Sequence, residues 1–170
     1  MLIILSGLPG TGKTTIAREL ALQLSAVHVR IDSIEQAIKN SGLVPEPTND
    51  AGYRVGYAIA EDNLKVGRTV VTDSVNPIHL ARDQWVIVAK NVHQQVIEVE
   101  ITCSDLAEHR RRVEARVADI VGHRMPSWHE VSVLDYHPWN RKHLVIDTAK
   151  TSLPEAVNII MSEIEKLSIK

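Results

Sequence analysis

The stretch Gly7–Thr15 reads GLPGTGKTT and decides the fold. Within it, Gly7–Thr14 matches the pattern G-x-x-x-x-G-K-[ST] without a mismatch. A short apolar run, Leu2–Leu5, precedes the stretch, and apolar side chains recur at helical spacing from Ile16 to Leu24 after it. Strand, glycine loop and helix in that order are the context that a phosphate-binding loop requires. The sequence therefore predicts a site for a nucleotide.

Each residue type in this loop has a physical task. Glycines let the backbone turn its amides toward phosphate, and the amino terminus of the helix adds a favourable dipole. Lys13 is expected to reach the β and γ oxygens, and the Thr14 hydroxyl to bind magnesium, so we expect ATP and Mg²⁺ as ligands. The residues expected to contact the nucleotide are Gly7, Gly10, Thr11, Gly12, Lys13, Thr14 and Thr15.

Four further strand-like runs follow the glycine loop, at residues 27–31, 69–72, 96–102 and 144–146. Five strands that alternate with helices predict an α/β fold of the P-loop NTPase type, with three α/β/α layers around a parallel sheet. We expect the kinase-type strand order 2-3-1-4-5. Ligands gather at the carboxyl ends of such strands, where the glycine loop, Asp32 and Asp73 all fall.

Length and charge limit the classes of function. With 170 residues, 44% of them hydrophobic, the chain has the size of one compact domain, residues 1–170. Its 19 basic residues nearly balance 21 acidic ones, so the charge does not favour a nucleic-acid partner. Cys103 is the single cysteine, which suits a reducing compartment, and the cytoplasm is our working assumption.

No segment predicts insertion into a membrane. Met1–Leu5 is a short apolar run without the cationic region of a signal peptide, and we interpret it as a buried strand. No uninterrupted apolar segment approaches the roughly 18 residues of a membrane span. We expect no membrane partner, and the sequence leaves the oligomeric state open.

The glycine loop alone does not choose among nucleotide-binding proteins. A guanine-specific GTPase is expected to carry N-K-x-D, which this sequence lacks. Asp119–Gly122 matches D-x-x-G, but it follows an arginine-rich helical stretch rather than a strand, so we interpret the match as coincidence. Large mechanical ATPases usually need a longer chain. These exclusions leave the small P-loop enzymes.

The sequence resembles the small P-loop phosphotransferases, which include chloramphenicol phosphotransferase, gluconate kinase, zeta-toxin kinases and the polynucleotide 5′-kinase domain. The resemblance spans most of the chain, and its elements are Gly7–Thr15, Arg30–Asp32, Thr72–Asn76 and Arg110–Arg116. Only the first of these is highly specific. The resemblance implies an ATP-dependent kinase that phosphorylates a hydroxyl group of a small molecule.

The resemblance also implies a role for Asp32. In these kinases an aspartate at the end of the second strand approaches the acceptor hydroxyl, and Asp32 holds that position here. A carboxylate can orient the alcohol and receive its proton. The alternative is that Asp32 only caps the next helix, a task that Ser33 could perform because Ser33–Gln36 has the form of a capping box. Arg30 either holds an anionic substrate or packs its stem on the sheet.

Asp73 follows a hydrophobic strand and resembles a Walker B carboxylate, which would bind magnesium beside Thr14. A purely structural role in the turn is the alternative. Arg112 and Arg116 are four residues apart and are expected on one face of a helix that closes over the phosphates. The alternative for this helix is a charged surface face. The predicted catalytic set is Asp32, Lys13, Arg112 and Arg116.

Two segments are expected to complete the site. A loop near residues 40–57, broken by Gly42, Pro45 and Pro47, is predicted to bind the acceptor, and residues near 105–140 are predicted to form a lid. Two other functions stay open. One is a 5′-hydroxyl polynucleotide kinase, weakened by the lack of basic composition. The other is a nucleotide-sensing protein that binds ATP with little transfer.

Overall fold

Five parallel strands form the centre of the protein. The computed structural model describes residues 1–42 and 49–168, and within them the sheet has the order β2-β3-β1-β4-β5. Each neighbouring pair of strands runs parallel. The strands are β1 (Leu2–Ser6), β2 (Val27–Arg30), β3 (Val70–Asp73), β4 (Val96–Thr102) and β5 (Leu144–Asp147). The predicted fold class and strand order are confirmed.

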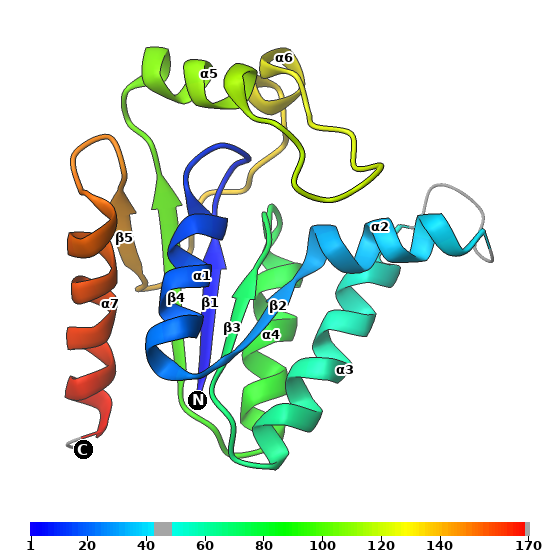
Figure 1. The fold of residues 1–170 in the computed structure, drawn as a ribbon. Helices are drawn as coiled ribbons and strands as arrows, with labels where there is room; N and C mark the ends of the chain where they lie inside the picture. The colour runs from blue at the N-terminus through cyan, green and yellow to red at the C-terminus, as the bar shows by residue number, and fades with distance from the viewer. Residues whose placement is uncertain (43–48, 169–170) are drawn as a thin grey trace.

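Helices cover both faces of this sheet, which makes it the middle of three layers (Figure 1). One face carries α1 (Lys13–Leu24) and α7 (Leu153–Ser168), and the other carries α3 (Ala51–Lys65) and α4 (His79–Asn91). Helix α2 (Ile31–Ser41) leaves the end of β2 and packs on α3. Above the carboxyl edge of the sheet lie α5 (Leu106–Ala115) and the short α6 (Trp128–Ser132).

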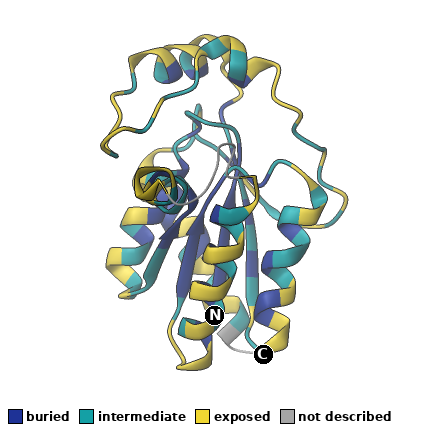
Figure 2. Cartoon of the chain, turned by 90° about the vertical axis from the view of Figure 1, so that its right-hand side faces the viewer, coloured by how far each residue is buried: buried dark blue, intermediate teal, exposed yellow. Residues whose placement is uncertain are grey.

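The side chains of β1 show why both faces are covered. All five of its residues are buried. Ile3 and Leu5 join the apolar cluster beneath α1 and α7, whereas Leu2 and Ile4 join the cluster beneath α3 and α4. Side chains alternate between the two faces of a strand, so a strand that is apolar at every position needs a layer on each side. Figure 2 shows the resulting pattern, with buried strands between helices whose outer faces are exposed.

Helix α2 begins earlier than the sequence pattern predicts. Arg30 has extended backbone and directly precedes the helix, so Asp32 and Ser33 already lie in the first turn, and the predicted capping box at Ser33–Gln36 is wrong. The position of Ile31 explains the difference. Its side chain is buried, and its Cδ1 atom lies 2.5 Å from where a Cβ on Gly56 would be. Packing of Ile31 on the bare backbone of α3 thus turns the chain into a helix at once.

The segment predicted as an acceptor loop near 40–57 is only partly a loop. Its first residues end α2, and residues 51–57 form the first turns of α3, so the described part of this segment is largely helical. The rest of the prediction falls mostly on residues 43–48, which lie outside the described part of the chain. No helix in the described residues is long and apolar enough to span a bilayer.

Candidate active site

The glycine loop has the shape that its motif predicts. Gly7, Gly10 and Gly12 have positive φ angles of 143°, 85° and 102°. Gly12 directly precedes α1, and no side chain caps that helix, so the amides of its first turn face the end of the loop. An anion at this point would receive those amides and the positive end of the helix dipole. The backbone therefore fits a phosphate group.

Lys13 lies buried beneath the loop. Its ammonium group donates a hydrogen bond to the Leu8 carbonyl at 2.9 Å. Burial lowers the pKa of Lys13 to about 8, and the carboxylates of Asp73 and Asp32 act in the opposite direction. The Lys13 ammonium group is thus bound to the backbone of the loop. A bound phosphate can replace that hydrogen bond.

Asp73 and Thr14 meet where β3 ends. Asp73 is 3% exposed, and the Thr14 side chain lies close enough to help lower the pKa of the Asp73 carboxyl group. Burial alone would raise the pKa of Asp73, but His28, Lys13 and Thr14 together hold that pKa below its ordinary value. Its Oδ2 atom is buried and makes no hydrogen bond to the described residues, with His28 Nε2 at 3.5 Å. An ionised carboxylate with a spare oxygen beside a hydroxyl fits Mg²⁺, which prefers hard oxygen ligands.

Asp32 stands one residue inside α2, with its side chain 38% exposed. The N-cap position of α2 is Arg30, so Asp32 does not stand where a capping side chain would. The Oδ2 atom of Asp32 lies 3.9 Å from the Arg30 guanidinium. Asp32 thus faces the phosphate side of the site with its acceptor oxygens available.

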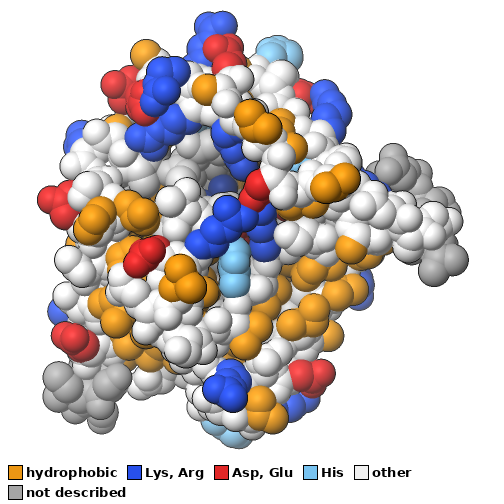
Figure 3. Space-filling view, in the orientation of Figure 1, with side chains coloured by type: hydrophobic (Ala, Val, Ile, Leu, Met, Phe, Trp, Pro, Cys, Tyr) orange, Lys and Arg blue, Asp and Glu red, His pale blue; other side chains and the backbone are white. Residues whose placement is uncertain are grey.

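One cavity of about 740 Å³ joins these groups. Figure 3 shows the hollow beneath α5, the helix of the predicted lid, with Lys and Arg side chains around it. Thr148 and Leu153, from the β5–α7 turn and the start of α7, close the end of the cavity away from Asp32. The predicted residues that line the cavity are Gly10, Gly12, Lys13, Thr14, Thr15, Asp32, Asp73, Arg112 and Arg116.

The two predicted lid arginines do not share one helix. Helix α5 ends at Ala115, and Arg116 follows it in extended backbone, so the expectation of a common helix face is wrong. Arg112 donates to Glu108 and to both the hydroxyl and the carbonyl of Thr148. Arg116 lies close enough to Lys13 for its charge to lower the pKa of that lysine. Both arginines therefore line the cavity, but they have different neighbours there.

Side chains of α5, the lid helix, contact the glycine loop, and the sequence pattern did not predict these contacts. His109 Nε2 lies 2.8 Å from the Pro9 carbonyl oxygen, and this nitrogen must carry the hydrogen because a carbonyl only accepts. A Cβ on Gly10 would lie 2.5 Å from Val113 Cγ2. Trp128 of α6 packs edge-on against His109 at 5.2 Å. Helical spacing places His109 and Val113 on one face, but their partners in the loop could not be read from it.

Asp119, the first residue of the D-x-x-G match, binds two arginines that the sequence pattern did not predict as its partners. Asp119, which follows α5, receives two hydrogen bonds from the Arg30 guanidinium, at 2.8 and 3.0 Å, and another from Arg18 of α1. Asp119 thus has a structural role in this fold. The sequence predicts that Arg30 either holds an anionic substrate or packs its stem on the sheet. It does hold an anion, but this anion is a side chain of the same protein.

Asn76, the last residue of the Thr72–Asn76 segment, is fully buried. It accepts hydrogen bonds from Trp85 and Ser74, and its own side chain donates to Ser6. The guanidinium of Arg82 binds the Asn76 carbonyl and lies over the rings of Tyr136 and Trp139. These residues connect the segment after β3 to the segment that contains Tyr136 and Trp139. They therefore help to hold the end of β3 in position.

The sequence matches the model of the family AAA_33, an AAA domain, over residues 2–127. The chain belongs to this AAA domain family. The match contains the glycine loop, Asp32, Asp73 and α5. A search of curated proteins gave no significant match.

Solved structures share the fold of this AAA domain protein over nearly the whole chain. The APS kinase CysC from Mycobacterium tuberculosis, in complex with AMPPNP and APS, has a TM-score of 0.71 at 17% identity, over 96% of both chains. A gluconokinase from Sinorhizobium meliloti 1021 has a TM-score of 0.63 at 19% identity, over 97% of this chain and 91% of the other. Kti12 from Chaetomium thermophilum, in complex with ADP-AlF3, has a TM-score of 0.68 at 20% identity, over 95% and 98%. The AAA domain described here therefore has the kinase-like P-loop fold.

Proposed function

We propose that this protein is an ATP-dependent phosphotransferase that moves the γ-phosphoryl group to a hydroxyl group of a small molecule. The observation that supports it most is that Asp32 lines the same cavity as Lys13, Thr14 and Asp73. A protein that only senses a nucleotide needs Lys13, Thr14 and Asp73. It has no need of Asp32. A carboxylate at the phosphate end of the cavity also gives an alcohol a partner for its proton.

In the proposed reaction the acceptor oxygen forms a bond to the γ-phosphorus as the bond from that phosphorus to the β,γ-bridging oxygen breaks. The electron pair of the broken bond leaves with ADP, and the hydroxyl proton passes to the Asp32 carboxylate. Lys13 and Arg116 supply positive charge where the transferred group gathers negative charge. Positioning of the two reactants in one cavity supplies much of the rate.

Thr14 and Asp73 are the residues that would hold Mg²⁺ in this proposal. Bound there, the ion supplies charge neutralisation at the phosphate oxygens. Arg112, anchored on Thr148, would border the nucleotide at the end of the cavity opposite Asp32. Thr11, whose carbonyl accepts from Thr148, ties this end to the glycine loop.

A transfer screen tests the proposed function. The protein is incubated with Mg-ATP and a panel of hydroxyl compounds that includes sugars, nucleosides and a short 5′-hydroxyl oligonucleotide, and ATP consumption is followed with mass spectrometry of the products. We expect a small-molecule product heavier by one phosphoryl group, and none with Lys13→Ala. Phosphorylation of the oligonucleotide alone would favour the polynucleotide kinase. Tight ATP binding without any product would favour the nucleotide sensor.

A further inference from the structure

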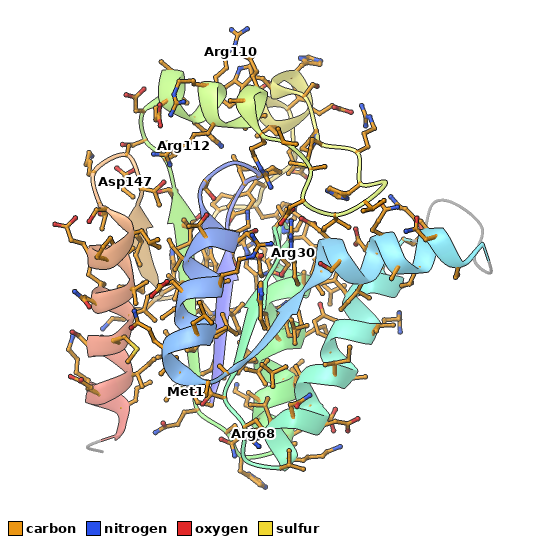
Figure 4. All side chains as sticks on the ribbon, in the orientation of Figure 1. Met1, Arg30, Arg68, Arg110, Arg112 and Asp147 are labelled. Carbon is orange, nitrogen blue, oxygen red and sulfur yellow. The ribbon has the colours of Figure 1, made fainter. Side chains whose placement is uncertain are left out.

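Arg30 holds an unusual position between the reacting groups. It is the last residue of β2, its side chain is 7% exposed, and Figure 4 places it at the carboxyl end of the sheet between α1 and α2. One terminal nitrogen lies 3.9 Å from Asp32 Oδ2, and its Nε lies 3.9 Å from Asp73 Oδ2. That Nε makes no hydrogen bond within the described part of the chain. Arg30 thus stands beside both the proposed acceptor carboxylate and the proposed metal carboxylate.

The two terminal nitrogens of Arg30, which we call the Arg30 fork, bind a carboxylate of the same protein. Both terminal nitrogens bind the Asp119 carboxylate, one to each oxygen, in the paired geometry that planar anions form with guanidinium groups. Asp119 comes from the lid segment and is 40% exposed, in contrast to the buried arginine. Its pKa lies below the ordinary value because of these hydrogen bonds from Arg30 and Arg18, so Asp119 is an anion at neutral pH.

We infer that Asp119 occupies the place of an anionic group of the acceptor, and that the acceptor is a hydroxyl compound carrying a carboxylate or phosphate that Arg30 binds. This inference rests on the proposed phosphotransferase function and names its substrate class. An anionic group in the Arg30 fork lies beside Asp32, so it brings a hydroxyl of the same molecule toward the proposed base. Asp119 releases the fork when the acceptor arrives.

The unequal burial of the two partners supports such an exchange. A buried guanidinium needs an anionic partner, because an unpaired buried charge is strongly unfavourable. Asp119, in contrast, can move its carboxylate into solvent at small cost, and Arg18, on the exposed surface of α1, can follow it. The exchange therefore replaces one anion on Arg30 with another and leaves no charge stranded. A neutral acceptor offers no such replacement.

Anion binding tests the inference without turnover. Protein saturated with Mg-AMPPNP, so that the glycine loop is filled, is titrated with inorganic phosphate and, separately, with acetate, and the backbone amide signals of residues 30–32, which every variant retains, are followed by NMR. For Asp119→Asn we expect binding of one or both anions about tenfold tighter than for the parent, because a charge-assisted pair has been freed. The gain should disappear in Arg30→Gln/Asp119→Asn and shrink in Arg30→Lys/Asp119→Asn, a variant that keeps the charge if the glutamine variant fails to fold.

Asp62→Asn is the matched control, since it removes one carboxylate from the exposed outer surface of α3 and leaves the site untouched. It should bind both anions as the parent does. Equal anion affinity in Asp119→Asn and the parent would overturn the inference, and so would a gain that survives the loss of Arg30. These results do not depend on whether transfer occurs, so they separate this inference from the proposed function.

The transfer screen then distinguishes the two sources of the anion. Matched pairs that differ in one charged group, gluconate with gluconamide and glucose 6-phosphate with glucose, show whether a carboxylate or a phosphate is preferred. For the productive acceptor, Asp119→Asn should lower KM several-fold with kcat little changed. A fall in kcat with KM unchanged would instead make Asp119 a latch that closes the lid, and a preference for the neutral member of each pair would also contradict the inference.

Discussion

Lys13 combines burial with a requirement for charge, and this makes nucleotide binding sensitive to pH. Its pKa of about 8 means that the ammonium form, which binds phosphate, is lost above that pH. We expect ATP affinity to be nearly constant below about pH 7 and about tenfold weaker at pH 9 than at pH 7, because only about a tenth of the lysine is protonated at pH 9. Calorimetric titration with Mg-ATP across this range measures the effect.

The matched variant is Lys13→Met, which keeps the length of the side chain without its charge. It should bind ATP weakly at every pH and lose the fall above pH 8. Thermal unfolding of the unliganded variant verifies that it folds. An unchanged pH profile in Lys13→Met would assign the titration to another group.

Asp73 and Thr14 are predicted to act through a shared metal ion. Asp73→Asn and Thr14→Ala should each weaken the apparent Mg²⁺ affinity in the presence of ATP by about tenfold or more, since each changes an oxygen ligand. The double variant should lose less than the product of the two, because the first change already disrupts the common site. Magnesium titrations of ATP binding provide the measurement. Parental titrations in both single variants would show that the ion lies elsewhere.

At the scale of elements, the lid helix α5 is held to the glycine loop through His109. His109→Ala removes the donor to the Pro9 carbonyl and should lower the free energy of unfolding by about 1–3 kcal/mol. Hydrogen exchange should also quicken over residues 106–115, because the helix loses a fastening on the loop beneath it. His109→Gln is the control, since its amide can still donate. Equal behaviour of the two variants in urea unfolding and in exchange would show that the hydrogen bond does not hold the lid.

The sequence predicted elements better than it predicted their ends. The strand-like runs placed β2, β3, β4 and β5, and the match to the phosphate-loop motif placed β1, the loop and α1. The start of α2 was misplaced because burial of Ile31 against Gly56, a contact between distant residues, overrides the local capping pattern. Arg116 left its expected helix face because α5 ends at Ala115. Local signals describe single segments, whereas packing between segments fixes their boundaries.

At the scale of the whole molecule, the sheet order assembles the site. In register, Asp73 stands opposite both Leu5 and Arg30, so groups far apart in the chain meet at one edge. A parallel sheet predicts that edge, and therefore the meeting of the glycine loop, Asp32 and Asp73 could be foreseen. The pairing of Arg30 with Asp119 could not, because the path of the lid segment depends on tertiary contacts that carry no sequence pattern.

In the proposed reaction, Asp32 serves the acceptor and not the nucleotide. Asp32→Asn keeps the size of the side chain and removes its charge, so Mg-ATP affinity measured by calorimetry should stay close to that of the parent. Single-turnover transfer to the acceptor identified in the screen should fall about 100- to 10,000-fold, the usual contribution of a positioned base. Transfer at the parental rate would contradict the account, and so would a loss of ATP affinity as large as the loss of transfer.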